Sequence, residues 1–146
     1  MANMSNYLEN KLIDFLFRSG SYTPPATLYI ALCTATPAET DTGSTISEVS
    51  GGNYSRQSVS SGASSWYSTQ QDTISTSSGS NGTTSNVSSI VWSGATWTAT
   101  VTAVAICDAS TGGNLLFYGA LTSSKAVSSG DTVNLFSGDL SIRIDD

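Results

Sequence analysis

The side chains that most often carry out chemistry in proteins are few in this chain. Its 146 residues contain no histidine, which removes the commonest general base and every Ser-His-Asp or Cys-His nucleophile system. The carboxylates lie mostly beside Gly, Ser or Thr in segments typical of turns, where water keeps them ionised. The sequence therefore predicts a protein that is not an enzyme, with no catalytic residue and no cofactor.

Two smaller groups of residues raise the question of a metal or redox site. Glu39, Asp41 and Glu48 lie in one acidic loop, but they lack the tight alternating spacing around a glycine that calcium loops have. Cys33 and Cys107 lie in segments typical of strands, too few and too far apart for a zinc cluster. We expect no metal site and two buried free thiols, with a disulfide between them as the alternative.

The charge balance argues against nucleic acid and membranes as partners. The chain has 5 Lys and Arg against 11 Asp and Glu, a net charge of -6, which cannot neutralise a run of phosphates. Its 28 Ser and 19 Thr predict a neutral surface rich in hydroxyls. The first twenty residues have charges inside their apolar pattern, which fits neither a signal peptide nor a membrane span.

One segment has the periodicity of a helix. Between Asn6 and Arg18, Leu8, Leu12, Phe15 and Leu16 recur at helical spacing and form one apolar stripe. Ser5 or Asn6 can cap the start, and Gly20 stands where a left-handed C-terminal cap is expected. We expect residues 1–21 to form a helical arm whose stripe packs on its own domain or on a neighbouring subunit.

From residue 22 the periodicity changes to that of strands. Short apolar and β-branched runs are separated by Gly, Ser, Asn and Asp turns, which is typical of antiparallel β domains. We therefore expect residues 22–146 to form one mainly β domain, an antiparallel β-sandwich or jelly-roll-like domain to which the helix is an appendage. The runs that carry this prediction are 28–34, 89–94, 96–108, 115–121, 132–136 and 140–144.

The stretch from about residue 60 to 89 is dominated by Ser, Thr, Gly, Asn and Gln. It has too few large apolar residues to carry much core, which predicts a long surface excursion. A flexible loop is one interpretation. The other is a loop that extends over a neighbouring subunit, with Trp66 and Tyr67 as its anchors, because aromatic residues dominate interface energetics.

Several segments together resemble a known family. They are LENKLIDFLFR, ATLYIALCTATP, EVSGGNYSRQ and, above all, AICDASTGGNLLFYGALTSSKAVSSGDTVNLFSGDLSI. These segments look like small structural proteins of tailed bacteriophages, members of which are often named tail fibre-like proteins. The resemblance covers roughly residues 7–58 and 90–142 and is weaker across the serine-rich middle.

The resemblance implies a component of the virion, assembled in the bacterial host. A compact β domain with an N-terminal arm is similar to capsid decoration, or cement, proteins, which commonly assemble as trimers. The expected partners are then other copies of the chain, as a homotrimer, and the major capsid protein. We expect Leu8, Leu12, Phe15, Leu16, Trp66 and Tyr67 to carry the contacts.

The alternative is a tail-associated protein, part of a tail fibre or tail tip, that acts in host adhesion. Its partners would be other tail proteins or a host glycan. Exposed aromatic residues such as Trp66, Tyr67 or Trp92 would then serve as platforms for the sugar.

Overall fold

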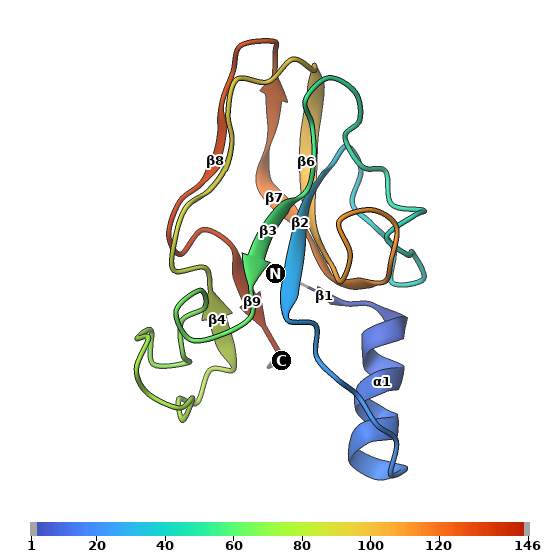
Figure 1. The fold of residues 1–146 in the computed structure, drawn as a ribbon, viewed down its shortest axis with the longest axis vertical. Helices are drawn as coiled ribbons and strands as arrows, with labels where there is room; N and C mark the ends of the chain where they lie inside the picture. The colour runs from blue at the N-terminus through green and yellow to red at the C-terminus, as the bar shows by residue number, and fades with distance from the viewer. Residues whose placement is uncertain (1–2, 145–146) are drawn as a thin grey trace.

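A computed structural model describes residues 3–144. It contains one helix and nine strands, and every strand pairing is antiparallel. Figure 1 shows the β domain along the long axis, with α1 projecting from one end. No helix among residues 3–144 is long and apolar enough to cross a membrane. The mainly β prediction with one N-terminal helix is confirmed.

The elements follow one another as β1 (Asn3–Met4), α1 (Asn6–Phe17), β2 (Thr27–Cys33), β3 (Gln57–Ser60), β4 (Thr83–Ser85), β5 (Ile90–Trp92), β6 (Ala99–Cys107), β7 (Leu115–Val127), β8 (Val133–Leu135) and β9 (Ser141–Arg143). Five of the strands form one sheet in the order β1-β7-β6-β2-β3. Two ribbons, β4-β9 and β5-β8, form separate two-stranded sheets. Of the two forms that we expected, a β-sandwich or a jelly-roll-like domain, a closed jelly roll is not observed, because the ribbons do not join the large sheet into one continuous surface.

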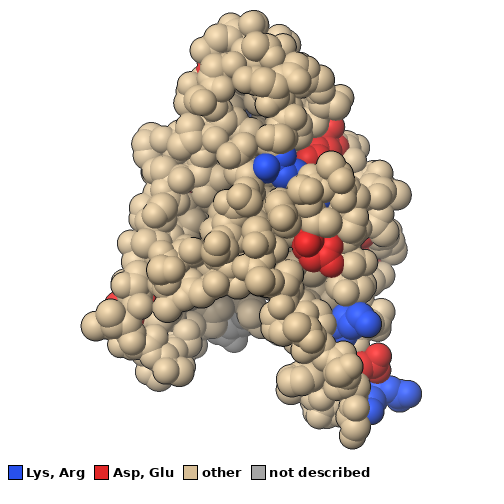
Figure 2. Space-filling model, in the orientation of Figure 1, with Lys and Arg blue, Asp and Glu red and all other residues tan. Residues whose placement is uncertain are grey.

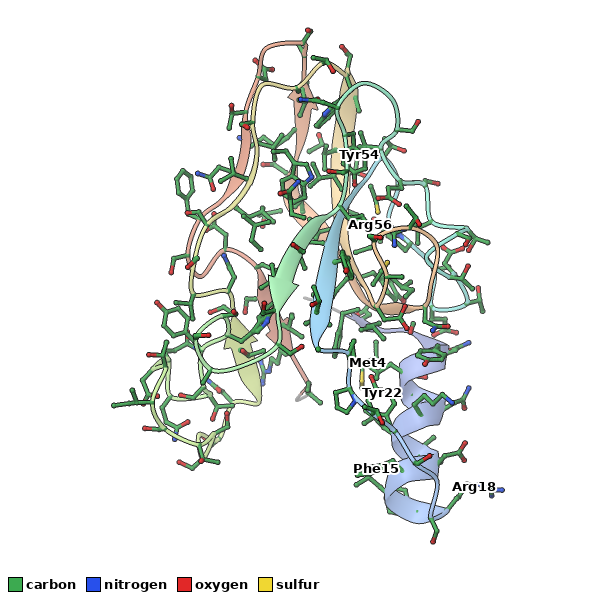
Figure 3. All side chains as sticks on the ribbon, in the orientation of Figure 1. Met4, Phe15, Arg18, Tyr22, Tyr54 and Arg56 are labelled. Carbon is green, nitrogen blue, oxygen red and sulfur yellow. The ribbon has the colours of Figure 1, made fainter. Side chains whose placement is uncertain are left out.

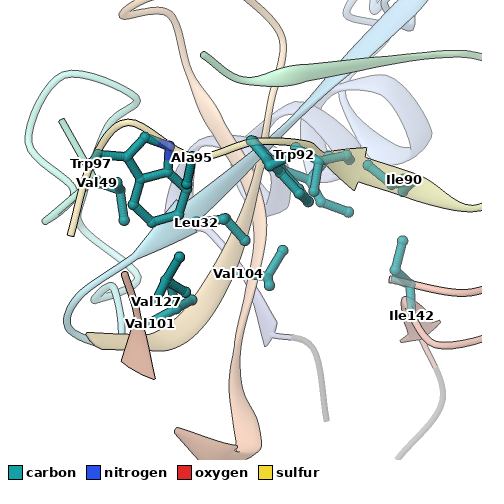
Figure 4. Packing of buried hydrophobic residues seen from close by; sticks show 12 residues of the cluster. Leu32, Val49, Ile90, Trp92, Ala95, Trp97, Val101, Val104, Val127 and Ile142 are labelled. Carbon is teal, nitrogen blue, oxygen red and sulfur yellow. The ribbon is translucent and has the colours of Figure 1, made fainter. Parts of the chain in front are cut away.

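The main core lies between the large sheet and the ribbons. Ile30, Leu32 and Val104 come from the sheet, whereas Ile90 and Trp92 come from β5. Figure 4 shows Leu32 and Val104 of the sheet beside Trp92 of β5, with Ile142 of β9 at one end of the cluster. The alternation of apolar residues along the strands therefore builds a sandwich that has one regular layer and one broken layer.

The opposite face of the sheet is lined by small side chains, among them Ala31, Ala103 and Ala105. Small residues let loops approach the sheet closely, and Ile46 packs here from the loop between β2 and β3. Cys33 and Cys107 are both buried on this face as free thiols.

The strand register explains why the cysteines form no disulfide. Cys33 pairs with Ala103, and Cys107 pairs with Tyr29, so the thiols stand four residues apart along the same pair of strands. At about 3.4 Å per residue this is roughly 13 Å, well beyond the roughly 7 Å that a disulfide spans between Cα atoms. Free thiols, rather than the alternative of a disulfide, are therefore correct.

Arg56 ties the loops of this face together. Its side chain is 2% exposed and forms an ion pair with Glu48 at 2.7 Å. Its guanidinium also donates to the carbonyl oxygens of Gly43, Ala109 and Gly112. Burial alone would lower the pKa of Arg56, but the hydrogen bond to the Glu48 carboxylate and its negative charge raise it overall. The acidic loop is thus fastened to the β6–β7 turn.

Candidate assembly surface

α1 begins where its first turn is fixed to the sheet. Ser5 is the N-cap, and its hydroxyl accepts a hydrogen bond from the amide of Leu8 at 3.3 Å and donates one to the carbonyl of Leu115. The Ser5 amide donates to the carbonyl of Leu116 at 3.0 Å. β1 precedes the cap and pairs with β7 at Tyr118 and Phe117. The N-cap prediction is therefore confirmed for Ser5.

The helix ends one residue earlier than expected. Ser19 adopts the left-handed conformation, with φ of 55°, that we had expected of Gly20. The amide of Gly20 donates to the carbonyl of Asp14 at 2.9 Å and closes the last turn. A Cβ at Gly20 would lie only 3.0 Å from Cβ of Asp14, so the chain needs glycine there for space rather than for its φ angle.

The apolar residues of α1 divide into a buried and an exposed group. Leu8 is buried against its own domain and Leu12 is half-buried. Phe15 and Leu16 are 51% and 64% exposed, so only part of the predicted stripe packs on its own domain. Figure 3 places Phe15 on the same side of α1 as Met4 and Tyr22, below the point where the helix meets the domain.

The sequence prediction missed two exposed apolar residues of the helix. Ile13 is 50% exposed and Phe17 is 81% exposed. At about 100° per residue, the apolar residues from Phe15 round to Phe17 span roughly 200° of the helix, about twice the arc that one docking face uses. The sequence could have revealed these two residues, because the apolar arc of the helix is wider than the single stripe of Leu8, Leu12, Phe15 and Leu16.

Exposed apolar area is concentrated on this helix. Eight large apolar side chains among residues 3–144 are exposed, and half of them lie on α1. The other four are scattered: Ile74, Val91, Phe136 and Ile144. Single exposed apolar residues are normal on a protein surface, whereas four within about two turns of one helix form a patch of the kind found at interaction sites.

The proposed loop anchors lie closer to the domain than we expected. Trp66 is half-buried, packs against the main core and pairs with Asn86 through an isolated β-bridge, so part of its side chain is covered by its own domain. Tyr67 is also half-buried, and its hydroxyl lies 3.4 Å from that of Ser137. A role for either residue at an interface remains a prediction.

The serine-rich loop holds itself together by its own hydrogen bonds. The carboxylate of Asp72 accepts from the amides of Ile74 and Ser75, and the Thr69 hydroxyl accepts from the amide of Gly79 at 2.7 Å. These contacts explain how a stretch with so few apolar residues keeps a defined path without a second subunit. Ile74 is 92% exposed in this loop.

The aromatic residues proposed as sugar platforms are not all accessible. Trp92 is only 4% exposed, and its indole NH donates to the carbonyl of Ser55 at 2.9 Å. Trp92 is therefore a core residue of β5 and cannot serve as a sugar platform in the adhesion hypothesis. Ile90 is buried with it, whereas Val91 between them is exposed. Because all three residues are apolar, the sequence has no alternation here that could have shown which of them faces the core.

The acidic loop is occupied by structural contacts. Asp41 accepts hydrogen bonds from the Ala38 amide at 2.8 Å and from the Thr45 hydroxyl at 2.9 Å, and Glu48 is engaged by Arg56. Within residues 3–144, no three Cys, Asp or Glu side chains come together as a group that could hold a metal ion.

A weakly charged β domain with an exposed apolar helix end is typical of subunits of larger assemblies. The comparison with protein families supports this class. A family model described as podophage GP4 fiber I protein gp80 matches residues 3–143. The chain belongs to this family of phage fibre proteins, and it is a non-enzymatic structural component of the virion. No match was found among curated proteins.

The family match separates the two functions that the sequence left open. It describes a fibre protein, which favours the tail-associated alternative. It gives no support to capsid decoration, which was our main expectation.

Proposed function

We propose that the protein is a subunit of a phage tail fibre. It assembles with other copies of itself through the exposed apolar residues of α1 and presents its β domain for host adhesion. The fibre description of the family supports the tail location. The observation that carries the self-assembly is the apolar end of α1, whose Phe15, Leu16 and Phe17 are 51%, 64% and 81% exposed.

The position of α1 suits attachment. Figure 1 shows the helix and the loop between β3 and β4 projecting from the same end of the long axis, while the turn that joins β7 to β8 lies at the opposite end. Contacts made through α1 therefore leave most of the surface of the β domain free. Figure 2 shows that the viewed face of this domain has few charged side chains, with several of the charges lying on α1.

A weakly charged, hydroxyl-rich domain suits adhesion to neutral polymers on a host surface. Such a surface makes short-range hydrogen bonds and has no strong field that salt would screen. We expect the purified protein to compete with phage for adsorption to host cells, with little dependence on salt concentration. Phage adsorption that is unaffected by excess protein would remove the adhesive role and leave the structural one.

The tail location is tested by the number of copies per virion, measured by quantitative mass spectrometry of purified particles against the major capsid protein. A small multiple of the tail symmetry is expected of a fibre subunit. A copy number close to that of the capsid protein would overturn the tail location and favour capsid decoration.

Self-assembly is tested by a charge placed on the exposed end of α1. We expect the purified protein to be a homo-oligomer, of which a trimer is the expected form, and Phe17→Asp to make it monomeric by light scattering. Ile74→Asp is the matched control, because Ile74 is at least as exposed but lies in the serine-rich loop. A Phe17→Asp protein that still assembles would contradict the role of α1.

A further inference from the structure

A deep groove separates β7 from the segment that contains β8. Its volume is about 640 Å3, and its lining includes Leu32, Val101 and Val104 of the main core. A second hollow of about 270 Å3 lies beside it, toward β9, and shares Val104, Leu121 and Leu135 with it. We call the two together the β7–β8 groove.

The groove exists because β7 and β8 follow each other in the chain without pairing. β8 pairs with β5, whereas β7 pairs with β6 and, at its first residues, with β1. From Gly119 to Val127 the outer edge of β7 has no strand partner among the described residues. The broken layer of the sandwich thus stays open on this side.

The outer edge of β7 is poorly suited to accept another strand. The pairing with β6 jumps from Val101↔Lys125 to Ala103↔Ala120, so residues 121–124 bulge out of the ladder. A bulge and an edge lysine are devices that prevent strand addition. An occupant of the groove therefore has to supply side chains rather than a strand.

The lining of the groove favours an occupant with apolar side chains. The core residues behind the groove, Leu32, Val101 and Val104, are already almost fully buried. The apolar area that an occupant can cover belongs to the half-buried Leu121, Val133 and Leu135 and to Phe136, which is 61% exposed. Polar groups stand at the sides. The Asn134 side-chain oxygen is buried without a hydrogen-bond partner within residues 3–144. The charged residues of the lining are Asp131, Asp139 and Lys125, which together give it a net charge of -1. The groove fits an apolar group that has a cationic or donor group beside it.

The end of α1 has this composition. Leu16 and Phe17 are its most exposed apolar residues, and Arg18 follows them directly with a side chain that is 72% exposed. No residue of α1 lines the groove of its own copy. In Figure 1 the helix points away from the β domain at one end of the molecule, whereas the β7–β8 turn lies at the other.

We propose that the end of α1 of one copy inserts into the β7–β8 groove of a neighbouring copy. This inference rests on the proposed self-assembly and names the surface that receives the helix. Each copy has one helix end and one groove, so the contact is heterologous, and it closes a ring or extends a filament. It covers both unpartnered apolar surfaces at once, whereas a bundle of α1 helices would leave the groove open.

The test uses two variants of the full chain that each disable one side of the contact. Leu16→Asp places a charge on the helix end. Ser123→Trp fills the groove from an exposed position in its lining. Ser124→Trp is the matched control, because Ser124 is exposed on the same strand but does not line the groove. Circular dichroism and thermal melting establish that all three proteins are folded.

We expect Leu16→Asp and Ser123→Trp each to weaken self-association by about tenfold to a hundredfold, the effect of losing the burial of one large apolar side chain. Ser124→Trp should assemble like the natural protein. An equimolar mixture of the two disabled proteins should form a 1:1 complex and nothing larger, because only one intact helix end and one intact groove remain. Native mass spectrometry measures these species.

The outcomes separate this inference from the proposed function. Ser123→Trp that assembles normally, while Leu16→Asp does not, would show that α1 binds elsewhere, and would overturn the groove while leaving self-assembly through α1 intact. A mixture that forms no complex would also overturn the insertion. A natural protein that is monomeric at all concentrations would overturn both proposals.

Discussion

Replacing Arg56 by alanine should be among the most destabilising single changes in this domain. The guanidinium has two hydrogen bonds from its Nε to the carboxylate of Glu48, at 3.0 and 3.1 Å, and one from Nη2 at 2.7 Å. It also donates to the carbonyls of Ala109 at 2.8 Å, Gly112 at 2.9 Å and Gly43 at 2.6 Å. Removing it leaves a carboxylate and three carbonyls without their shared donor.

The expected loss in the free energy of unfolding follows from the burial of the Arg56–Glu48 ion pair. The Arg56 side chain is 2% exposed and the Glu48 side chain 21% exposed, so water reaches only part of the carboxylate once the guanidinium is gone. Breaking a buried ion pair by removing one partner costs about 3–5 kcal/mol. The individual hydrogen bonds are not additive with this figure, because they belong to the same network. A loss of about 3–5 kcal/mol is a large share of the roughly 5–15 kcal/mol by which domains are stable.

Urea unfolding of Arg56→Ala, Arg56→Lys and the natural protein measures this loss. Arg56→Lys keeps the charge but not the planar fork of donors, and should fall between the other two. Arg18→Ala is the matched control, because its ion pair with Asp14 is exposed, at 72% and 55%, and should contribute no more than about 0.5 kcal/mol. A loss below about 1 kcal/mol for Arg56→Ala would refute the reasoning.

Three further predictions concern the same fold. Gly43→Ala should destabilise the domain by about 1–3 kcal/mol in urea titrations, since its Cβ would lie 1.9 Å from the carbonyl oxygen of Gly112, and an unchanged midpoint would contradict this. Burial raises the pKa of Cys33 to about 12 and that of Cys107 to about 11, so neither should react with a thiol reagent at pH 8 until urea unfolds the chain. Hydrogen bonds from Ser75 lower the pKa of the Asp72 carboxyl group. These hydrogen bonds should therefore order the loop fully above the ordinary carboxyl pKa, and the order should be lost as the pH falls through the lowered pKa of Asp72. Protection of the amides of residues 68–79 from hydrogen exchange, relative to the intrinsic rate at each pH, should then fall in acid, and Asp72→Asn should remove that pH dependence.

The strands that alternate clearly could be predicted from the sequence. The expected run at 96–108 contains β6, and the residues between it and the expected run at 115–121 join β6 to β7, with Cys107 paired to Leu115. Local periodicity and turn residues decide such elements. β1, β3 and β4 were missed because they are two to four residues long and mostly polar, so only their pairing with distant strands defines them.

The candidate surface was predictable in part, for a related reason. The helical stripe identified the correct element, but spacing alone could not show which side chains its own domain covers. Leu8 is buried because the Ser5 cap and β1 fix the first turn against β7, a contact between residues more than a hundred positions apart. The β7–β8 groove left no trace in the sequence, because it arises from two strands that do not pair.

The way α1 is held links its order to assembly. A helix of 12 residues is marginal by itself in water, and here only its first turn is fixed by the cap and by the burial of Leu8. The last turn has the exposed pair of Asp14 and Arg18, which contributes little. Contacts that bury Leu16 and Phe17 in a neighbouring copy would therefore stabilise the last turn of α1, which is the turn that contains these two residues. Under the proposed assembly, the second half of the helix is most ordered in the fibre, and its apolar residues are covered only there.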